Sequence, residues 1–195
     1  MFYKDGMTDK RQVLHNIIYK PKTGEQVVRA IYSHPPIYLY SDLVKNMKQK
    51  GAADVLYEMA AKNNDSLILV QDPKQLNSGH WTSLSFHPEK REIYFFSSYG
   101  GKPDVEKNQW LPLSGLMSSG QDLNVFNDGL KELMLKDGWV IHYSQYPYQV
   151  VGDNTATCGI WCAAFLNSGL NPDEFNRYVK YNGYNPFVFY RMYFH

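Results

Sequence analysis

Both cysteines of the chain lie in the stretch "DNTATCGIWCAAFL" at residues 153–166, which contains no charged or strongly polar residue from Cys158 onward. A run without a polar face predicts a helix buried in the core, and we place its start near Thr157 or Cys158. Cys158 and Cys162 then lie one turn apart on the same face of that helix. Their spacing leaves three roles to weigh: a metal clamp, a redox pair, or one nucleophile with a bystander.

The first two roles fit the sequence poorly. A zinc site needs three or four ligands, and "CGIWC" comes with neither a second ligand pair nor a His-x-Glu block. A redox motif has two residues between its cysteines rather than three, and a pair four apart on one helix rarely has disulfide geometry. We therefore predict no metal and no cofactor. Cys158 is the candidate nucleophile, and Cys162 is a small buried hydrophobe.

Composition narrows the class of protein. The 195 residues suit one domain with a hydrophobic core, and a formal net charge of +1 provides no field that would steer the chain to nucleic acid. Lys45, Lys48 and Lys50 form a short basic run, which a solvated helix face explains. The polar start "MFYKDGMTDKRQ" does not resemble a secretory signal, and no stretch is apolar enough to span a bilayer. We expect an intracellular, soluble protein that has no membrane partner.

The remaining chain predicts short helices and strands. Helices are predicted at 41–51, with Ser41 as the capping residue, and at 52–64, 126–138 and 172–181. Strands are predicted at 66–71 and 139–146, with a hairpin of 81–87 and 92–99 across the turn "PEKR". The segment 100–110 is predicted as a loop. The aromatic tail 181–194 is expected to pack across the body, because disordered segments are poor in aromatic residues.

This succession of elements predicts an α+β fold with helices packed on a central sheet. The first forty residues are ambiguous, since "KRQVLHNIIYK" has helical spacing while the prolines of "HPP" force an extended stretch. We predict an N-terminal arm or subdomain at 1–40 and a single compact domain at 41–195.

A nucleophilic Cys158 needs help to ionise. A free thiol has a pKa of about 8.5, and a helix dipole contributes at most roughly 2 kcal/mol, or about 1.5 pK units. An imidazolium partner must supply the remainder. His80 in "SGHWTSL" is the best placed histidine, because it begins a strand after a flexible Ser-Gly. The other candidates are His15, His87 and His142.

Three blocks carry a resemblance to a known family. "SGHWTSLSF", "FFSSYGG" and "DNTATCGIWCAAFL" resemble, in this order, the adenain and ubiquitin-like-protein protease group of cysteine proteases, and most of all its viral maturation proteases of the virophage and large-DNA-virus type. The resemblance covers residues 66–168. It implies a papain-like core with a central mixed β-sheet, Cys158 as nucleophile, His80 as base, and Trp81 as the roof of a narrow substrate groove. It also implies a preference for small residues such as glycine before the scissile bond.

The sequence departs from the family at the acid position. An acidic residue or Asn is expected about seventeen positions after the histidine, where this chain has Ser97. A serine hydroxyl can accept the imidazole N–H but supplies no negative charge. Ser97 is therefore the candidate that orients His80. The alternatives are that Asp104 or Glu92, two nearby acids, takes this role, or that Ser97 is an ordinary hairpin serine.

A second departure concerns the oxyanion hole. The family usually has a glutamine six or seven residues before the cysteine, whereas Gln149 lies nine before it. Gln149 reaches the site if the loop bulges at Gly152 and Asp153. Asn154 is the rival side-chain donor, and the backbone N–H of Cys158 contributes in either case.

The resemblance implies a thiol endopeptidase that cleaves viral capsid or core protein precursors during virion maturation. Its partner is a protein substrate, and its location is the virion and the host-cell interior, in the cytoplasm or a viral factory. An activating peptide or DNA, as used by adenain-like enzymes, is not predicted as a requirement. The alternatives are a deconjugating protease for ubiquitin-like modifiers and a non-catalytic binding module of the same fold.

Overall fold

A five-stranded sheet forms the centre of the molecule. The computed structural model describes residues 5–194, with the side chains of 5–11 and 75–78 left out, so residues 1–4 of the polar start lie outside the described residues. The strands are β1 (Ile37–Leu39), β2 (Asp65–Asp72), β3 (Gln75–His87), β4 (Glu92–Ser97) and β5 (Val140–Tyr143), in the order β1-β2-β3-β4-β5. The pairs β1–β2 and β4–β5 are parallel, and the two pairs between them are antiparallel. The predicted α+β class with a central mixed sheet is confirmed.

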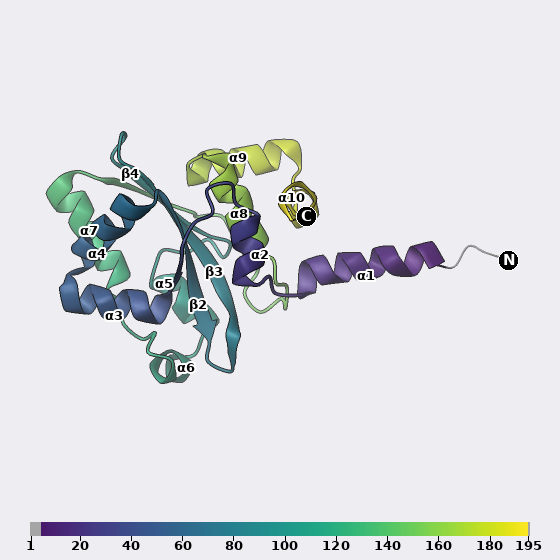
Figure 1. Cartoon of the computed structure of the whole chain (residues 1–195), viewed down its shortest axis with the longest axis horizontal. Coiled ribbons are helices and arrows are strands. Elements are labelled where there is room, and N and C mark those ends of the chain that lie inside the picture. Colours follow the sequence, from purple (N-terminus) through teal and green to yellow (C-terminus); the bar gives the residue numbers. More distant parts are fainter. Residues whose placement is uncertain (1–4, 195) are drawn as a thin grey trace.

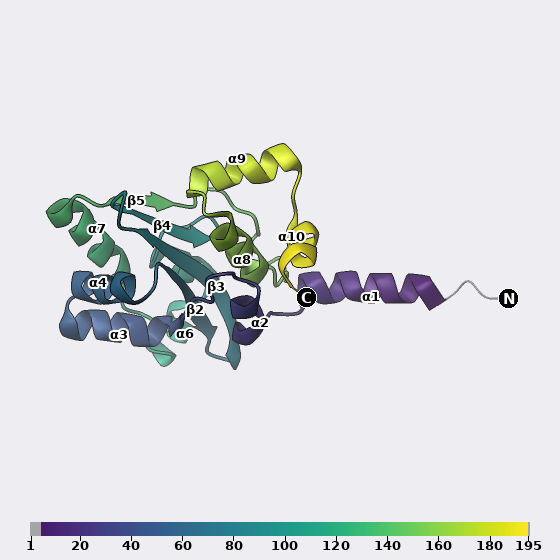
Figure 2. The same cartoon turned by 45° about the horizontal axis from the view of Figure 1, so that its top comes forward.

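Helices cover both faces of this sheet (Figure 1). One face carries α3 (Tyr40–Lys50), α4 (Ala52–Lys62) and α7 (Phe126–Asp137), and the other carries α2 (Gly24–Arg29), α8 (Cys158–Ser168), α9 (Pro172–Asn182) and α10 (Pro186–Tyr193). The short helices α5 (Val105–Trp110) and α6 (Leu113–Ser118) follow β4. Helix α1 (Asp5–Tyr19) extends away from the body, with its C-terminal end near α10 (Figure 2). No helix within residues 5–194 is both long and apolar enough to cross a bilayer.

Two hydrophobic cores lie on opposite sides of the sheet because side chains alternate along each strand. In β4, Tyr94 and Phe96 pack into the core under α8 and α9, whereas Ile93 and Phe95 pack into the core under α3, α4 and α7. Helix α8 is buried along nearly its whole length. Its apolar sequence is thereby explained, since no face of it has to meet water.

Several elements predicted from the sequence are confirmed. The hairpin across "PEKR" forms β3 and β4, and the helices predicted at 52–64, 126–138 and 172–181 form α4, α7 and α9. The cysteine helix begins at Cys158 and ends at Gly169, which has the left-handed backbone that favours glycine. The aromatic tail packs on the body as expected, with Phe189 fully buried against Trp161.

Three predictions of local structure are wrong. Ser41 does not cap a helix, because α3 begins one residue earlier at Tyr40 with no side-chain cap. The loop predicted at 100–110 contains α5, and the tail adds the helix α10 beyond the helix predicted to be the last. Helix α5 is short and depends on tertiary contacts, such as the buried ammonium of Lys107, which donates to the carbonyls of Gln121 and Leu123. Such contacts leave no local signal in the sequence.

The first forty residues contribute to the body at two places. Strand β1 pairs with β2, and α2 packs against α8 with Val27 completely buried. Helix α2 is well defined by a capping box, in which Thr23 and Gln26 bond each other's backbone N–H groups.

The tail provides a test of the packing. Replacing the fully buried Phe189 by Ala should lower the free energy of unfolding by about 3–5 kcal/mol, because a large aromatic side chain leaves a cavity in the core under α8. The control Tyr181→Ala, at a tyrosine that is 92% exposed, should change it by less than about 0.5 kcal/mol. Urea denaturation followed by circular dichroism measures both. Equal stability of the two variants would contradict the packed tail.

Candidate active site

The predicted nucleophile and base meet where α8 packs on β3. Cys158 is the first residue of α8, and His80 lies opposite Val70 in the β2–β3 ladder. The side chains of Cys158 and His80 are close enough for each to shift the pKa of the other. Cys158 is 7% exposed and His80 only 2%. The interaction therefore lies in a low-dielectric site, where it is stronger than in water.

This contact favours the charged form of both groups. Burial alone raises the pKa of the Cys158 thiol, but the neighbouring His80 imidazole outweighs it, so the pKa lies below its ordinary value. The backbone N–H groups of Trp81 and Gly159 also lower it. Burial lowers the pKa of His80, yet the neighbouring Cys158 and Glu106 side chains raise it to about 9. The arrangement therefore favours the thiolate of Cys158 and the imidazolium of His80 over their neutral forms.

The two nitrogens of the His80 ring have different partners. Nε2 lies 3.1 Å from the Ser97 hydroxyl and 3.6 Å from a carboxylate oxygen of Glu106. Nδ1 is buried and forms no hydrogen bond with any described residue, which leaves it available to the thiol of Cys158, whose charge acts on the ring. The Nε2 edge of the ring thus faces a hydroxyl and a carboxylate.

Glu106 is the residue that sequence reasoning missed. It belongs to α5, within the segment predicted as a loop, and is 2% exposed. The two acids considered from the sequence have other partners: Asp104 accepts hydrogen bonds from Tyr40 and from a backbone N–H, and Glu92 accepts one from Tyr94. Glu106 lies 26 residues after His80 in the chain, so no spacing rule pointed to it.

A buried network holds α5 in place. The hydroxyl of Tyr40 and the backbone N–H of Asn127 both donate to the carboxylate of Asp104, directly before α5. The ammonium of Lys107 lies 4.8 Å from the centre of the Tyr40 ring. Asp104 and Lys107 are thus fixed on either side of Glu106, which positions the Glu106 carboxylate beside His80.

A cleft of about 310 Å³ opens at Cys158. Its walls come from the segment after α1, the β2–β3 turn, the end of β4 with α5, and the loop before α8; the lining includes Tyr19, Pro21, Lys22, Asp72, Gly79, Trp81, Tyr99, Trp110, Gln149, Asn154, Thr155, Ala156 and Cys158. Trp81 lines this cleft, and because it is only 5% exposed it is also part of the core. Its indole N–H donates to the carbonyl of Lys22.

The two candidate oxyanion donors differ in environment. Gln149 is buried, and its side-chain oxygen accepts from the hydroxyls of Ser98 and Thr157. Its side-chain nitrogen donates to the carbonyl of Thr155 at 2.6 Å and has a second N–H. Asn154 lies on the rim, exposed, with a positive φ of 58°. Gly152 also has a positive φ, 86°, so the loop makes the bulge that brings Gln149 to the cleft.

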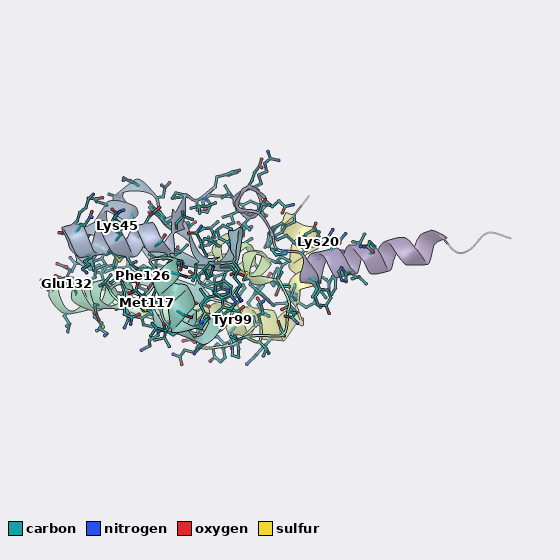
Figure 3. All side chains as sticks on the ribbon, turned by 90° about the horizontal axis from the view of Figure 1, so that it is seen from below. Lys20, Lys45, Tyr99, Met117, Phe126 and Glu132 are labelled. Atoms are coloured by element: carbon teal, nitrogen blue, oxygen red, sulfur yellow. The ribbon has the colours of Figure 1, made fainter. Side chains whose placement is uncertain are left out.

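Two aromatic residues flank the imidazole. The ring of Tyr99 stacks on His80 with centroids 4.1 Å apart and planes tilted by 16°, and the ring of Trp110 lies 6.2 Å away. Figure 3 labels Tyr99 in the body of the protein. An aromatic face stabilises a cation above it, so these rings favour the imidazolium and restrict its rotation.

Cys162 lies outside this chemistry. Its side chain is completely buried, its sulfur contacts the carbonyl of Trp81, and burial raises its pKa well above the ordinary value. The predicted role as a buried hydrophobe fits this environment.

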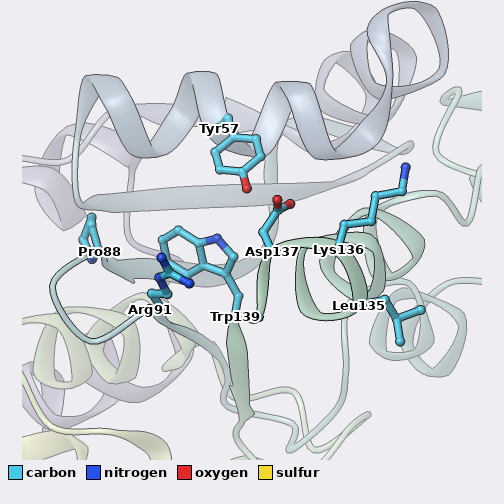
Figure 4. A pocket seen from close by; sticks show the side chains of 8 residues that line it. Tyr57, Pro88, Arg91, Leu135, Lys136, Asp137 and Trp139 are labelled. Atoms are coloured by element: carbon cyan, nitrogen blue, oxygen red, sulfur yellow. The ribbon is translucent and has the colours of Figure 1, made fainter.

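A second depression, of about 710 Å³, lies at the other end of β4 (Figure 4). Tyr57, Arg91, Lys136, Asp137 and Trp139 line it, together with Pro88, Leu135 and Gly138. Glu92 begins β4 beside Arg91, whereas Ser97 ends it beside His80. The depression is therefore separate from the cleft at Cys158.

Comparison with known sequences gives one relationship. No family model matches the chain. The chain is 33% identical over 144 residues to the uncharacterized protein V9 of the Sputnik virophage. The aligned residues make up 73% of this chain and 74% of the relative. The chain belongs to the family of virophage protein V9. The virophage resemblance predicted from the sequence is consistent with this relationship.

Two solved structures are also similar at low level. The SUMO protease Ulp1 with its catalytic cysteine oxidised to a sulfonic acid has a TM-score of 0.34 at 15% identity, and the catalytic domain of the Ulp1-like SUMO protease of Chaetomium thermophilum has 0.35 at 14%. They cover 74% and 75% of this chain. The chain spans 61% and 59% of their own lengths.

The contact of Glu106 with His80 can be tested directly. Glu106→Gln keeps the size of the side chain but removes its charge, so the pKa of His80 should fall below about 9. Ser97→Ala should lower it less, because a hydroxyl carries no charge. An NMR titration of the His80 imidazole measures both. A pKa that falls in Ser97→Ala and stays unchanged in Glu106→Gln would make Ser97 the dominant partner.

Proposed function

We propose that the protein is a cysteine endopeptidase in which Cys158 is the nucleophile and His80 is the general acid and base. The observation that carries this proposal is the buried imidazole beside a thiol at the start of α8, with Ser97 and Glu106 at its Nε2 atom. A thiol, an oriented base and an adjacent cleft are the parts that acyl transfer requires.

The first step is attack on the carbonyl carbon of a peptide bond in the cleft. The thiolate of Cys158 forms the new C–S bond, and the carbonyl oxygen takes up the negative charge. The backbone N–H of Cys158, at the beginning of α8 where N–H groups lack helical partners, is one donor to that oxygen. The second N–H of the Gln149 amide is the other, because the amide oxygen is already committed to two hydroxyls.

The imidazolium of His80 then donates its proton to the leaving amine as the C–N bond breaks. The neutral imidazole takes a proton from water, which hydrolyses the thioester and releases Cys158. Glu106 and Ser97 position the ring throughout, and the charge of Glu106 favours the imidazolium that the first step needs. Both are positioning residues, since they act through His80.

The substrate we propose is a viral capsid or core protein precursor, cleaved after small residues during virion maturation. Two observations support this. The chain belongs to a virophage protein family, and the cleft at Cys158 is walled on one side by Trp81 and on another by residues 154–156. A confined cleft admits a chain of small residues more readily than bulky ones. Action within the virion or the infected cell follows from such a substrate.

Cleavage assays should separate this proposal from its alternatives. Internally quenched peptides with glycines before the scissile bond represent a precursor, and a ubiquitin-like modifier with a fluorogenic C-terminal leaving group represents deconjugation. Cleavage of the peptides alone supports the endopeptidase. Cleavage of the modifier alone favours the deconjugating protease, and cleavage of neither by a chain whose Cys158 labels as an ordinary thiol favours the binding module.

The same peptides test the assignment of the pair. Cys158→Ala and His80→Ala should each reduce kcat/KM at least about a thousandfold, because the nucleophile and its base act as a unit. Cys162→Ala is the matched control in the same helix and should retain most activity, since Cys162 does not reach the cleft. Turnover in Cys158→Ala comparable to that of Cys162→Ala would remove the assignment.

The oxyanion role has its own signature. Gln149→Ala should lower kcat by roughly 100-fold with little effect on KM, because the donor acts chiefly on the transition state. Asn154→Ala should change kcat far less. Steady-state kinetics of both variants measure the difference, and the reverse order would transfer the role to Asn154.

A further inference from the structure

The last residues of α1 and the segment that follows them span the cleft from one side to the other. The carbonyl of Ile18 accepts a 2.6 Å hydrogen bond from the backbone N–H of Ala156, two residues before the nucleophile. The carbonyl of Lys22 accepts one of 3.2 Å from the indole N–H of Trp81, the neighbour of His80. Residues 18–22, called here the N-terminal strap, therefore connect the two elements that carry the catalytic pair.

Lys22 is the unusual residue of the N-terminal strap. It is 7% exposed, and its ammonium donates to the backbone carbonyls of Asn16, Ile17 and Lys20 at 3.0, 3.3 and 2.6 Å. No carboxylate pairs with it among the residues the structure describes. A buried ammonium without an anionic partner costs free energy, so a negative charge that forms nearby stabilises it.

That negative charge forms at Cys158. Lys22 and Cys158 line the same cleft, and the stem of Lys22 packs beside the residue after the nucleophile: a Cβ placed on Gly159 would lie 3.5 Å from that of Lys22. The two groups also interact electrostatically. Burial lowers the pKa of Lys22, and the negative charge of Cys158 opposes that shift.

The other groups around these two side chains are few. His80 on β3, Tyr99 after β4 and Cys162 on α8 interact with Cys158. Lys22 is approached by the exposed Lys20 and by the ring of Tyr190 on α10, whose centre lies 5.6 Å from the ammonium. Since Tyr99 and Cys162 are neutral when His80 and Lys22 are charged, the cations near the thiol come from β3 and the N-terminal strap.

We infer that Lys22 is a second cation of the site, which stabilises the Cys158 thiolate together with the His80 imidazolium and makes the N-terminal strap part of the active centre. The inference rests on the proposed function. It gives the region before α2 a role in catalysis: α1 and the strap hold the ammonium in place through backbone carbonyls. Lys22 is thus a positioning and electrostatic residue, and no bond to it forms or breaks.

The test is the rate of iodoacetamide alkylation of Cys158 in the full chain from pH 5 to 9, with Cys158 and Cys162 distinguished by tandem mass spectrometry. Lys22→Gln retains N–H donors for the three carbonyls but has no charge, and Lys22→Arg retains the charge. Lys20→Gln is the matched control at an exposed lysine on the same strap, which Figure 3 labels at the end of α1.

The pKa of the Cys158 thiol is below its ordinary value in the native protein. Cys158 should therefore label at pH 6, a pH about two units below the pKa of an ordinary thiol. Lys22→Gln should raise that pKa and slow labelling at pH 6 about tenfold, because loss of a neighbouring cation moves a pKa by roughly one unit. Lys22→Arg and Lys20→Gln should label within about twofold of the native rate. Cys162 should remain unlabelled in every folded variant.

Two outcomes separate the inference from the proposed function. If His80→Ala slows labelling at pH 6 but Lys22→Gln does not, the role of Lys22 is overturned while the catalytic pair stands. If His80→Ala leaves the profile unchanged, the pair itself fails. Circular dichroism verifies folding, and should Lys22→Gln not fold, Lys22→Met, which keeps the apolar stem, replaces it with the same expected tenfold loss.

Discussion

A buried imidazole between a thiol and a carboxylate is the constraint on which the candidate site depends. Neither the thiolate of Cys158 nor the carboxylate of Glu106 would be stable in an apolar interior alone, because a buried charge needs a partner. The imidazolium of His80 lies between them and serves both. The low dielectric strengthens both interactions, so both neighbours depend on the same ring.

The rest of the fold serves to bring these partners together. The mixed sheet has a hydrophobic core on each face, and this allows α8 to be apolar along its whole length and to present its first residue to β3. On the other side, Tyr40 of α3 and Asn127 of α7 bind Asp104, so the helices of the second core hold α5 in position. The site is therefore supported from both cores at once.

The position of the acid illustrates how a site can keep its chemistry while its residues come from different elements. Ser97 occupies the strand position where the resemblance implies an acid, and it still contacts His80. The negative charge comes instead from Glu106, on a helix that follows β4. On the opposite side of the cleft, the N-terminal strap contributes Lys22. The imidazole and the thiol are thus surrounded by groups from three separate parts of the chain: β4, α5 and the N-terminal strap.

The sequence by itself determined the elements whose signals are local. Alternation and turn residues defined the hairpin that carries His80 and Ser97, and an apolar run defined the helix that begins at Cys158. Bulge-forming residues before the helix indicated how Gln149 reaches the cleft. Tertiary structure alone decided the placement of Glu106 and Lys22. Helix α5 is too short to be stable by propensity and exists because buried contacts hold it. The charge of Lys22 acts on the cleft only because the strap crosses it, since the energy of a buried charge depends on neighbours that are distant in the sequence.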